Sequence, residues 1–143
     1  MSKKPIIVFE GIEGTGKSHH IHNVARYLKK NNKSFIQIRE PGGSANSEKI
    51  RNLILNNKST FNKETDLLLY LSARSENIEI IRQNAGKKII LIDRFSDSTI
   101  AYQHYGMGVN LKFIQNCIVH KRLLGLSGHS IMYHDFDKMF LID

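Results

Sequence analysis

A short apolar run followed by a glycine-rich turn, residues 6–18, constrains the fold of this chain more than any other stretch. Ile6–Phe9 is continuously apolar, which is typical of a strand covered on both faces. The residues that match the spacing G-x-x-x-x-G-K-[ST] are Gly11, Gly16, Lys17 and Ser18. Glycines let the backbone approach an anion, and the N–H groups of the turn and of the helix start behind it can then surround phosphate oxygens. The stretch predicts a buried strand, a phosphate-binding loop and a helix.

The rest of the chain alternates between strand and helix patterns. Further strands are expected at Ser34–Arg39, Lys88–Asp93 and Met139–Asp143, and helices up to Lys30, around 50–54, over Lys63–Asn84, over Asp97–His104 and from Leu111 to Leu124. Residues 125–137 show no clear period. Strands that alternate with helices imply an α/β fold with a parallel sheet and right-handed crossovers. With 143 residues, of which 41% are hydrophobic, a single domain over residues 1–143 is expected.

The charge and the cysteine content restrict the class of partner. The net charge is +8, from 21 Lys and Arg against 13 Asp and Glu, so an acidic partner is expected. A nucleotide is favoured over a nucleic acid, because the basic residues are spread along the chain and no run of them sits beside aromatic residues. No signal peptide or membrane span is predicted. The single Cys117 suits a reducing compartment, which favours the cytoplasm.

A series of motifs separated along the chain occurs in a fixed order. They are the loop Phe9–Ser18, then Arg39-Glu40-Pro41-Gly42-Gly43, then Tyr70-Leu71-Ser72-Ala73-Arg74, then Asp93-Arg94-Phe95 with Ser98-Thr99 and Ala101-Tyr102-Gln103. Together, from about Pro5 to Asn116, they resemble bacterial thymidylate kinase. The resemblance implies the P-loop nucleoside monophosphate kinase fold, a parallel sheet flanked by helices. It also implies transfer of the ATP γ-phosphate to dTMP, giving dTDP for dTTP biosynthesis.

The resemblance assigns one group of residues to ATP and Mg²⁺. The expected ATP-binding residues are Gly11, Glu13, Gly14, Thr15, Gly16, Lys17 and Ser18. Lys17 can reach the β and γ phosphates, and the hydroxyl of Ser18 can bind Mg²⁺. Asp93 would assist the same metal ion through water. The expected catalytic residues are Lys17, Asp93 and Arg94.

A second group of residues is assigned to dTMP. Its members are Glu13, Arg39, Pro41, Arg51, Tyr70, Arg74, Arg94, Thr99, Tyr102 and Gln103. Glu13 is similar to the acidic residue of the family that binds the 3′-hydroxyl of the sugar. Arg51 and Arg94 correspond to phosphate-binding arginines, and two guanidiniums on one phosphate would fix the acceptor oxygen in line with the γ-phosphate.

The base and the remaining face of the sugar are assigned to two helices. Tyr70 and Arg74 are four residues apart, so they share one helix face, and in the family these positions stack on thymine and hydrogen-bond to it. Thr99, Tyr102 and Gln103 resemble the nucleoside-contacting face of the next helix. Tyr102 would pack against the deoxyribose and disfavour a 2′-hydroxyl.

Departures from the family pattern leave alternatives open. His19 stands where the family usually has Thr, and His19 with His22 could form a metal site, although exposed polar residues at a first turn are the favoured interpretation. Lys121–Lys138 does not resemble the short approach to the fourth strand of the family. The chain ends at Asp143, where the family continues into a lid, a further strand and adenine-binding residues. A C-terminally truncated kinase is therefore expected, without the lid and the last strand.

Other functions compete with this interpretation. A GTPase would need a base-reading motif of the N-K-x-D kind, which the sequence lacks. Another nucleoside or nucleotide kinase of the same fold remains an alternative, and so does a truncated nucleotide-binding fragment without catalysis. The resemblance also implies a homodimer packed through helices.

Overall fold

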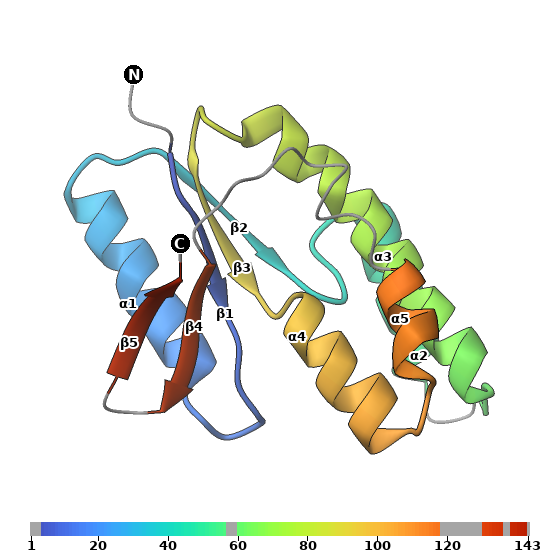
Figure 1. Ribbon diagram of the computed structural model, residues 1–143. Coiled ribbons are helices and arrows are strands. Elements are labelled where there is room, and N and C mark those ends of the chain that lie inside the picture. Colours follow the sequence, from blue (N-terminus) through green and yellow to red (C-terminus); the bar gives the residue numbers. More distant parts are fainter. Residues whose placement is uncertain (1–3, 57–59, 118–129, 136–137, 143) are drawn as a thin grey trace.

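The sheet at the centre of the molecule carries the expected strands. The computed structural model describes residues 4–56, 60–117, 130–135 and 138–142 (Figure 1). Three parallel strands lie in the order β1-β3-β2, and they are β1 (Ile6–Phe9), β2 (Phe35–Arg39) and β3 (Ile89–Asp93). Phe9 and Arg39 both lie opposite Asp93, so the three strands end together. In open parallel sheets ligands bind at this carboxyl edge.

The helices also follow the sequence pattern, although the short helix expected around 50–54 begins earlier, at Ala45, and the helix expected at Asp97–His104 changes its geometry. They are α1 (Lys17–Lys30), α2 (Ala45–Ile54), α3 (Lys63–Asn84), α4 (Ser96–Thr99), the π-helix η1 (Ile100–Gly106) and α5 (Leu111–Cys117). The helix expected at Asp97–His104 is α4 continued by η1, so its second half has π rather than α geometry. The part of the expected last helix beyond Cys117 lies outside the described residues. No helix in the described part of the chain is long and apolar enough to cross a membrane.

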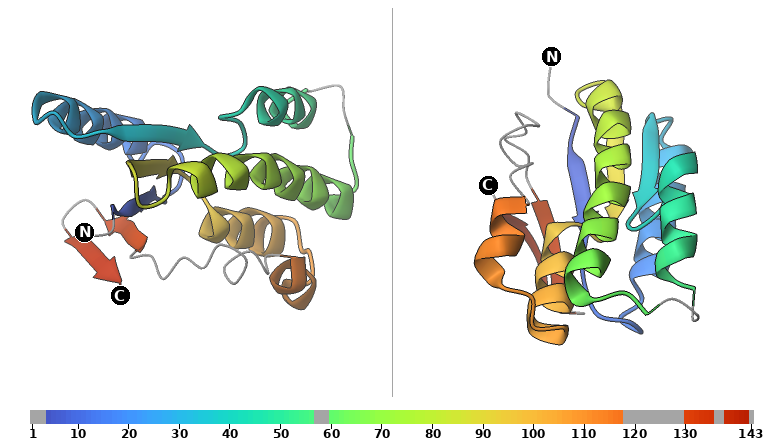
Figure 2. Two further views of the ribbon diagram at one scale, coloured as in Figure 1. Left: turned by 90° about the horizontal axis from the view of Figure 1, so that it is seen from above. Right: turned by 90° about the vertical axis from the view of Figure 1, so that its right-hand side faces the viewer.

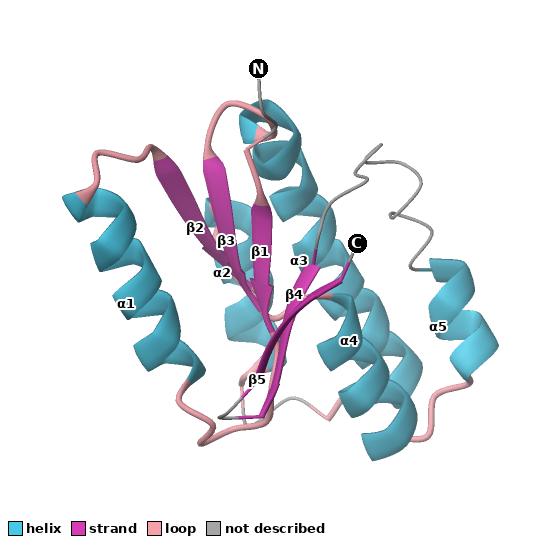
Figure 3. Ribbon diagram, turned by 60° about the vertical axis from the view of Figure 1, so that its left-hand side comes forward, coloured by secondary structure: helices cyan, strands magenta, loops and turns pink. Residues whose placement is uncertain are grey.

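Helices cover both faces of the sheet (Figures 2 and 3). Successive residues of a strand point to opposite faces, so β3 serves both layers. Leu91 packs with Ile21 and Leu28 of α1, whereas Ile90 packs with Ile81 of α3. All of these side chains are buried. A continuous apolar strand is thus explained by a helix on each side of it.

A further apolar cluster joins α3 to the segment that follows η1. Leu67 and Leu71 of α3 pack with Val109 and Ile114, and all four side chains are buried. The N–H of Val109 donates to the carbonyl oxygen of Gln103 at 2.8 Å. This packing holds η1 alongside the first half of α3 (Figure 1).

The last two strands form a separate sheet. β4 (Ser130–Asp135) and β5 (Lys138–Ile142) pair antiparallel, and β4 runs beside β1 (Figure 3). The expected strand at Met139–Asp143 is therefore present as β5, but the prediction of parallel pairing was wrong for it. Only residues 136–137 connect β4 to β5, and so short a connection permits only an antiparallel pair. β4 lies in the stretch where the sequence showed no period.

Candidate active site

The glycine-rich loop between β1 and α1 has the backbone that its sequence predicts. Its glycines have positive φ angles, which are 151° for Gly11, 84° for Gly14 and 78° for Gly16. A Cβ on Gly11 would lie 3.0 Å from Oγ1 of Thr15, a tight contact that the Thr15 side chain would have to relieve. The carbonyl oxygen of Ile12 accepts hydrogen bonds from Oγ1 of Thr15 at 2.8 Å and from Nζ of Lys17 at 2.7 Å. The loop therefore closes on itself, with the Lys17 ammonium across it.

The charges around Lys17 identify the groups that share this edge of the sheet. Burial and the Arg94 guanidinium lower the pKa of the Lys17 ammonium. The groups that oppose this shift are Asp93, Tyr102 and Glu10. A lysine and an arginine that repel one another across a partly open site are stabilised by an anion between them. The site is therefore suited to a phosphate group.

Arg94 occupies the corner between β3 and α4 in an unusual conformation. Its φ angle is 67°, which few residues other than glycine adopt. Its N–H donates to the carbonyl oxygen of Phe9 at 2.9 Å. Its Nη1 donates to Oγ of Ser98 at 3.4 Å and to the hydroxyl of Tyr102 at 3.2 Å, and its Cζ lies 5.2 Å from the centre of the Tyr102 ring. Arg94 is thus held at its backbone by β1 and at its side chain by α4 and η1.

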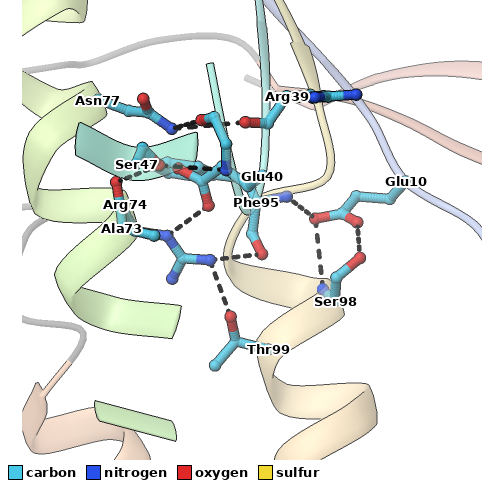
Figure 4. Close-up of polar contacts among 11 residues, drawn as sticks. Glu10, Arg39, Glu40, Ser47, Ala73, Arg74, Asn77, Phe95, Ser98 and Thr99 are labelled. Atoms are coloured by element: carbon cyan, nitrogen blue, oxygen red, sulfur yellow. Dashed lines mark hydrogen bonds and ion pairs between the residues drawn. The ribbon is translucent and has the colours of Figure 1, made fainter. Parts of the chain in front are cut away.

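Arg74 lies at the centre of a buried polar network (Figure 4). Its residue is 3% exposed, and its Nε donates to Oε2 of Glu40 at 2.7 Å. Its Nη2 donates to Oγ1 of Thr99 at 2.8 Å and to the carbonyl oxygen of Phe95 at 2.9 Å. Burial raises the pKa of the Glu40 carboxyl, and the Arg74 guanidinium opposes that shift.

This network contains two buried polar atoms that lack hydrogen-bond partners among the described residues, Nη1 of Arg74 and Oε1 of Glu40. Buried donors and acceptors of this kind are nearly always paired in native proteins. An unpaired donor on a guanidinium whose other nitrogens are already engaged is therefore a candidate contact for a ligand with a carbonyl oxygen.

Two further arginines of the candidate site are Arg39, at the end of β2, and Arg51, on α2, and the Arg39 side chain is exposed. Arg39 forms an ion pair with Glu48 of α2, at 2.9 Å between Nη2 and Oε2 and 3.1 Å between Nε and Oε1. Oε1 of Glu48 also accepts from the N–H of Gly43 at 2.8 Å. Arg51 of α2 donates through Nη1 to the carbonyl oxygen of Pro41 at 2.7 Å, next to the cis Glu40–Pro41 bond.

The remaining predicted contacts with the base lie on α3 and η1. Burial raises the pKa of the Tyr70 hydroxyl, Asp66 raises it further, and Arg51 and Arg94 oppose the shift. Tyr70 therefore lies within electrostatic reach of both arginines expected to bind the acceptor phosphate. Gln103 is 2% exposed, and its Nε2 donates to Oδ2 of Asp66 at 3.3 Å.

Asp93 and Ser18 carry oxygen atoms of the kind that bind Mg²⁺. Oδ1 of Asp93 is buried and has no hydrogen-bond partner in the described part of the chain. A carboxylate oxygen of this kind fits Mg²⁺, which takes one or two protein oxygens and otherwise uses water and phosphate. Ser18 and Glu13 are both exposed to solvent. His19 is also exposed, and across residues 4–56 and 60–117 no group of three or more His, Cys, Asp or Glu side chains could hold a metal ion.

The sequence interpretation missed several residues that build this site. Glu10 and Ser98 join β1 to α4, and Asn77 and Ser47 fasten the loop after β2 to α3 (Figure 4). Nδ2 of Asn77 donates to the carbonyl oxygen of Gly42 at 2.7 Å. A buried position for Asn77 could have been inferred from its place four residues after Ala73, one helical turn along α3. Nothing in the sequence indicated its partner.

Comparison with known proteins agrees with this geometry. The family model for thymidylate kinase matches residues 9–138. The thymidylate kinase of Kosmotoga olearia is 41% identical over 110 residues, which cover 76% of this chain and 53% of that protein. The thymidylate kinase of Thermosipho africanus is 46% identical over 99 residues, which cover 68% of this chain and 49% of that protein.

A solved structure is similar over more of its length. The crystal structure of thymidylate kinase from Ehrlichia chaffeensis aligns with a TM-score of 0.78 and 32% identity, covering 95% of this chain and 75% of that chain. This chain spans about half the length of the curated relatives that it matches. The family match extends over most of the chain and includes the loop, the β3–α4 corner and α3. The chain therefore belongs to the thymidylate kinase family.

Proposed function

We propose that this chain phosphorylates dTMP to dTDP with ATP and Mg²⁺, as a step toward dTTP. The observation that carries the proposal is the convergence of Lys17, Asp93 and Arg94 at the carboxyl edge of the parallel sheet. Phosphoryl transfer requires positioned charges around the phosphates more than it requires covalent chemistry. Membership of the thymidylate kinase family supports dTMP as the acceptor.

The loop is proposed to bind the phosphates of ATP. Its residues in this role are Gly11, Glu13, Gly14, Thr15, Gly16, Lys17 and Ser18. Lys17 would exchange the carbonyl oxygen of Ile12, which its Nζ contacts at 2.7 Å, for phosphate oxygens. Negative charge at that point would offset the repulsion between Lys17 and Arg94 that lowers the pKa of Lys17.

Ser18 and Asp93 are proposed to hold Mg²⁺, with Asp93 acting through water. Oδ1 of Asp93, which is buried and has no hydrogen-bond partner among the described residues, supports this assignment. Mg²⁺ held there would supply positive charge that offsets the negative charge developing on the phosphates during transfer.

The acceptor nucleotide is proposed to lie between α3 and η1. Arg51 and Arg94 would bind its phosphate, and the pKa of Tyr70 responds to both of these arginines. Nη1 of Arg74, buried and without a partner among the described residues, would donate to a carbonyl oxygen of thymine, with Tyr70 stacked on the ring. The sugar would contact Glu13 and Tyr102. The other proposed contacts with dTMP are Arg39, Pro41, Thr99 and Gln103.

We further propose one P-loop kinase domain over residues 1–143, a cytoplasmic location and a homodimer. The single Cys117 supports a reducing compartment. Leu53 and Leu55 near the end of α2 and Leu68 on α3 are 44%, 53% and 49% exposed, and they offer an apolar surface to a second copy. Light scattering after size-exclusion chromatography tests the dimer, and a monomer at micromolar concentration would contradict it.

The function is tested by dTMP-dependent formation of ADP from ATP and Mg²⁺ by the purified chain, with Lys17→Ala as the control. Turnover that disappears in K17A is the expected result. A folded chain that binds dTMP and ATP without turnover would support the non-catalytic fragment instead. A panel of dTMP, dUMP, dCMP and dGMP tests the base preference, and equal rates with all four would support a different kinase of the same fold.

A further inference from the structure

Glu10 is a buried carboxylate to which the proposed mechanism gives no role. It follows β1 directly, and its residue is 7% exposed. Its Oε1 accepts from the N–H of Phe95 at 2.8 Å and from the N–H of Ser98 at 3.4 Å, while its Oε2 accepts from the Ser98 hydroxyl (Figure 4). Both oxygens are therefore occupied by one turn of the chain, the corner between β3 and α4.

That corner carries the left-handed conformation of Arg94. A residue with a side chain keeps a positive φ only where its surroundings determine the backbone. The two N–H groups on either side of the Arg94 Cα both donate to the end of β1, that of Arg94 to the Phe9 carbonyl oxygen at 2.9 Å and that of Phe95 to Glu10 at 2.8 Å. Glu10 therefore supplies one of the two bonds that fix the direction of the Arg94 side chain.

The Ser98 hydroxyl also links Glu10 to the guanidinium of Arg94. A carboxylate can only accept, so the hydroxyl proton of Ser98 is directed at Glu10. The lone pairs of the same oxygen then remain for Nη1 of Arg94, which lies 3.4 Å away. Two linked hydrogen bonds therefore connect Glu10, through the Ser98 hydroxyl, to the Arg94 guanidinium.

We propose that Glu10 is a positioning residue for the acceptor phosphate. It holds Arg94 where the guanidinium meets the phosphate of dTMP, by way of the Phe95 amide and the Ser98 hydroxyl. Glu10 does not contact the nucleotide itself, because both of its oxygens are engaged within the corner. The inference rests on the proposed function, and within it on Arg94 as a phosphate ligand.

The test compares the affinity for dTMP with that for thymidine, measured by calorimetry. Thymidine lacks the phosphate, so the dissociation constant for thymidine divided by that for dTMP reports on the contacts with the phosphate, which the proposed function gives to Arg51 and Arg94. We expect E10A to reduce this ratio on the order of 10- to 100-fold, because a small displacement of a binding group is enough for such a loss. The affinities for thymidine and for ATP should stay close to those of the wild type.

Two conservative variants separate hydrogen bonding from charge. E10Q keeps the shape of the side chain, and its amide oxygen can still accept from Phe95, so E10Q should retain most of the preference for dTMP. S98A removes only the hydroxyl between Glu10 and Arg94. Its preference for dTMP over thymidine should therefore lie between those of the wild type and E10A. E79Q, on an exposed acid of α3 that pairs with Arg82, is the matched control and should change nothing.

A double variant tests whether Glu10 acts through Arg94. If it does, E10A/R94A binds dTMP no more weakly than R94A alone, because the two changes remove the same interaction. Equal losses for dTMP and thymidine in E10A, or additive losses in the double variant, would overturn the inference. If E10A does not fold, a dTMP preference in S98A equal to that of the wild type would overturn it.

The outcomes also separate this inference from the proposed function. A wild-type chain that binds neither dTMP nor ATP would overturn the proposed function and the inference with it. A wild-type chain that prefers dTMP to thymidine, beside an E10A variant with the same preference, would overturn the inference alone.

Discussion

Two arginine–glutamate pairs meet at the end of β2, one on each side of the chain. Arg39 pairs with Glu48 at 2.9 Å, and the two side chains are 54% and 36% exposed. Its neighbour Glu40 pairs with Arg74 at 2.7 Å, and those side chains are 5% and 4% exposed. The bond lengths are nearly equal, so burial is what distinguishes the pairs. An exposed pair competes with water, whereas a buried pair cannot lose one member without leaving a charge in a place of low polarity.

The pKa shifts show the same contrast. Burial raises the pKa of Glu40, while the hydrogen bonds from Arg39 and from the Gly43 amide lower the pKa of Glu48. The buried carboxylate is held as part of the framework of the site, and Nη1 of its partner Arg74 has no hydrogen-bond partner in the part of the chain that the structure describes. The exposed pair is open to exchange with a ligand or with solvent. The comparison therefore predicts unequal consequences for substitutions at Glu40 and at Glu48.

The largest effect is expected for Glu40→Ala. It leaves the Arg74 guanidinium buried without its counter-charge, so the free energy of unfolding should fall by about 3–5 kcal/mol. Urea denaturation followed by circular dichroism measures this loss. The double variant E40L/R74M should recover part of the stability, because it removes both charges. A loss in E40A no greater than that in E48A would contradict the comparison.

Asn77→Ala should have the next largest effect on stability. The change removes the donor to the Gly42 carbonyl oxygen, a bond of 2.7 Å between buried groups, and leaves that oxygen unsatisfied. We expect a loss of about 1–3 kcal/mol in the free energy of unfolding. Ser75→Ala, on the exposed face of the same helix, is the control. Equal stability of N77A and S75A would show that solvent reaches the loop after β2.

Glu48→Gln is expected to change the stability least at neutral pH. Both partners of the pair are substantially exposed, and 0.5 M salt should remove most of whatever difference remains. Thermal denaturation of wild type and E48Q at low and high salt provides the measurement. A large, salt-independent difference would mean that the pair is shielded from solvent.

The pH dependence should differ in sign between the two acids. The pKa of Glu48 is lowered on folding, so its contribution to stability is present above the ordinary value of 4.5 and is lost as the pH falls below it. The pKa of Glu40 is raised on folding, so its contribution is greatest below 4.5 and declines as the pH rises through the raised value. Raising the pH from 3.5 should therefore stabilise the wild type relative to E48Q and destabilise it relative to E40Q. Slopes of the same sign would contradict the comparison.

Much of the framework was predictable because it depends on local patterns. The apolar run before the glycines predicted β1 with the bounds that the structure has, and α3 was predicted over its full length, Lys63–Asn84. The π geometry of η1 was not predicted, since an apolar period over a few residues does not distinguish it from an α-helix. β4 was missed, and the orientation of β5 was wrong, because pairing direction depends on which strands are neighbours.

The candidate site shows the same difference between features set by local motifs and features set by long-range contacts. Lys17, Asp93 and Arg94 were predicted from motifs, and the structure brings their charges together at one edge of the sheet. The contacts of Arg74 were not predicted: its partners Glu40 and Thr99 lie 34 and 25 residues away along the chain. The roles assigned to these residues in binding dTMP stay predictions until the affinities are measured.

The sequence alone determined the glycine-rich loop, the alternation of strands and helices, and the resemblance to thymidylate kinases, because each of these depends on spacings between near neighbours. Only the tertiary structure decided which of two adjacent residues at the end of β2 faces solvent and which is buried. It also decided that Glu10 bonds to the corner that carries Arg94. The physical reason is that burial and long-range hydrogen bonds depend on which elements pack together. That packing is set by the whole core and not by any single motif.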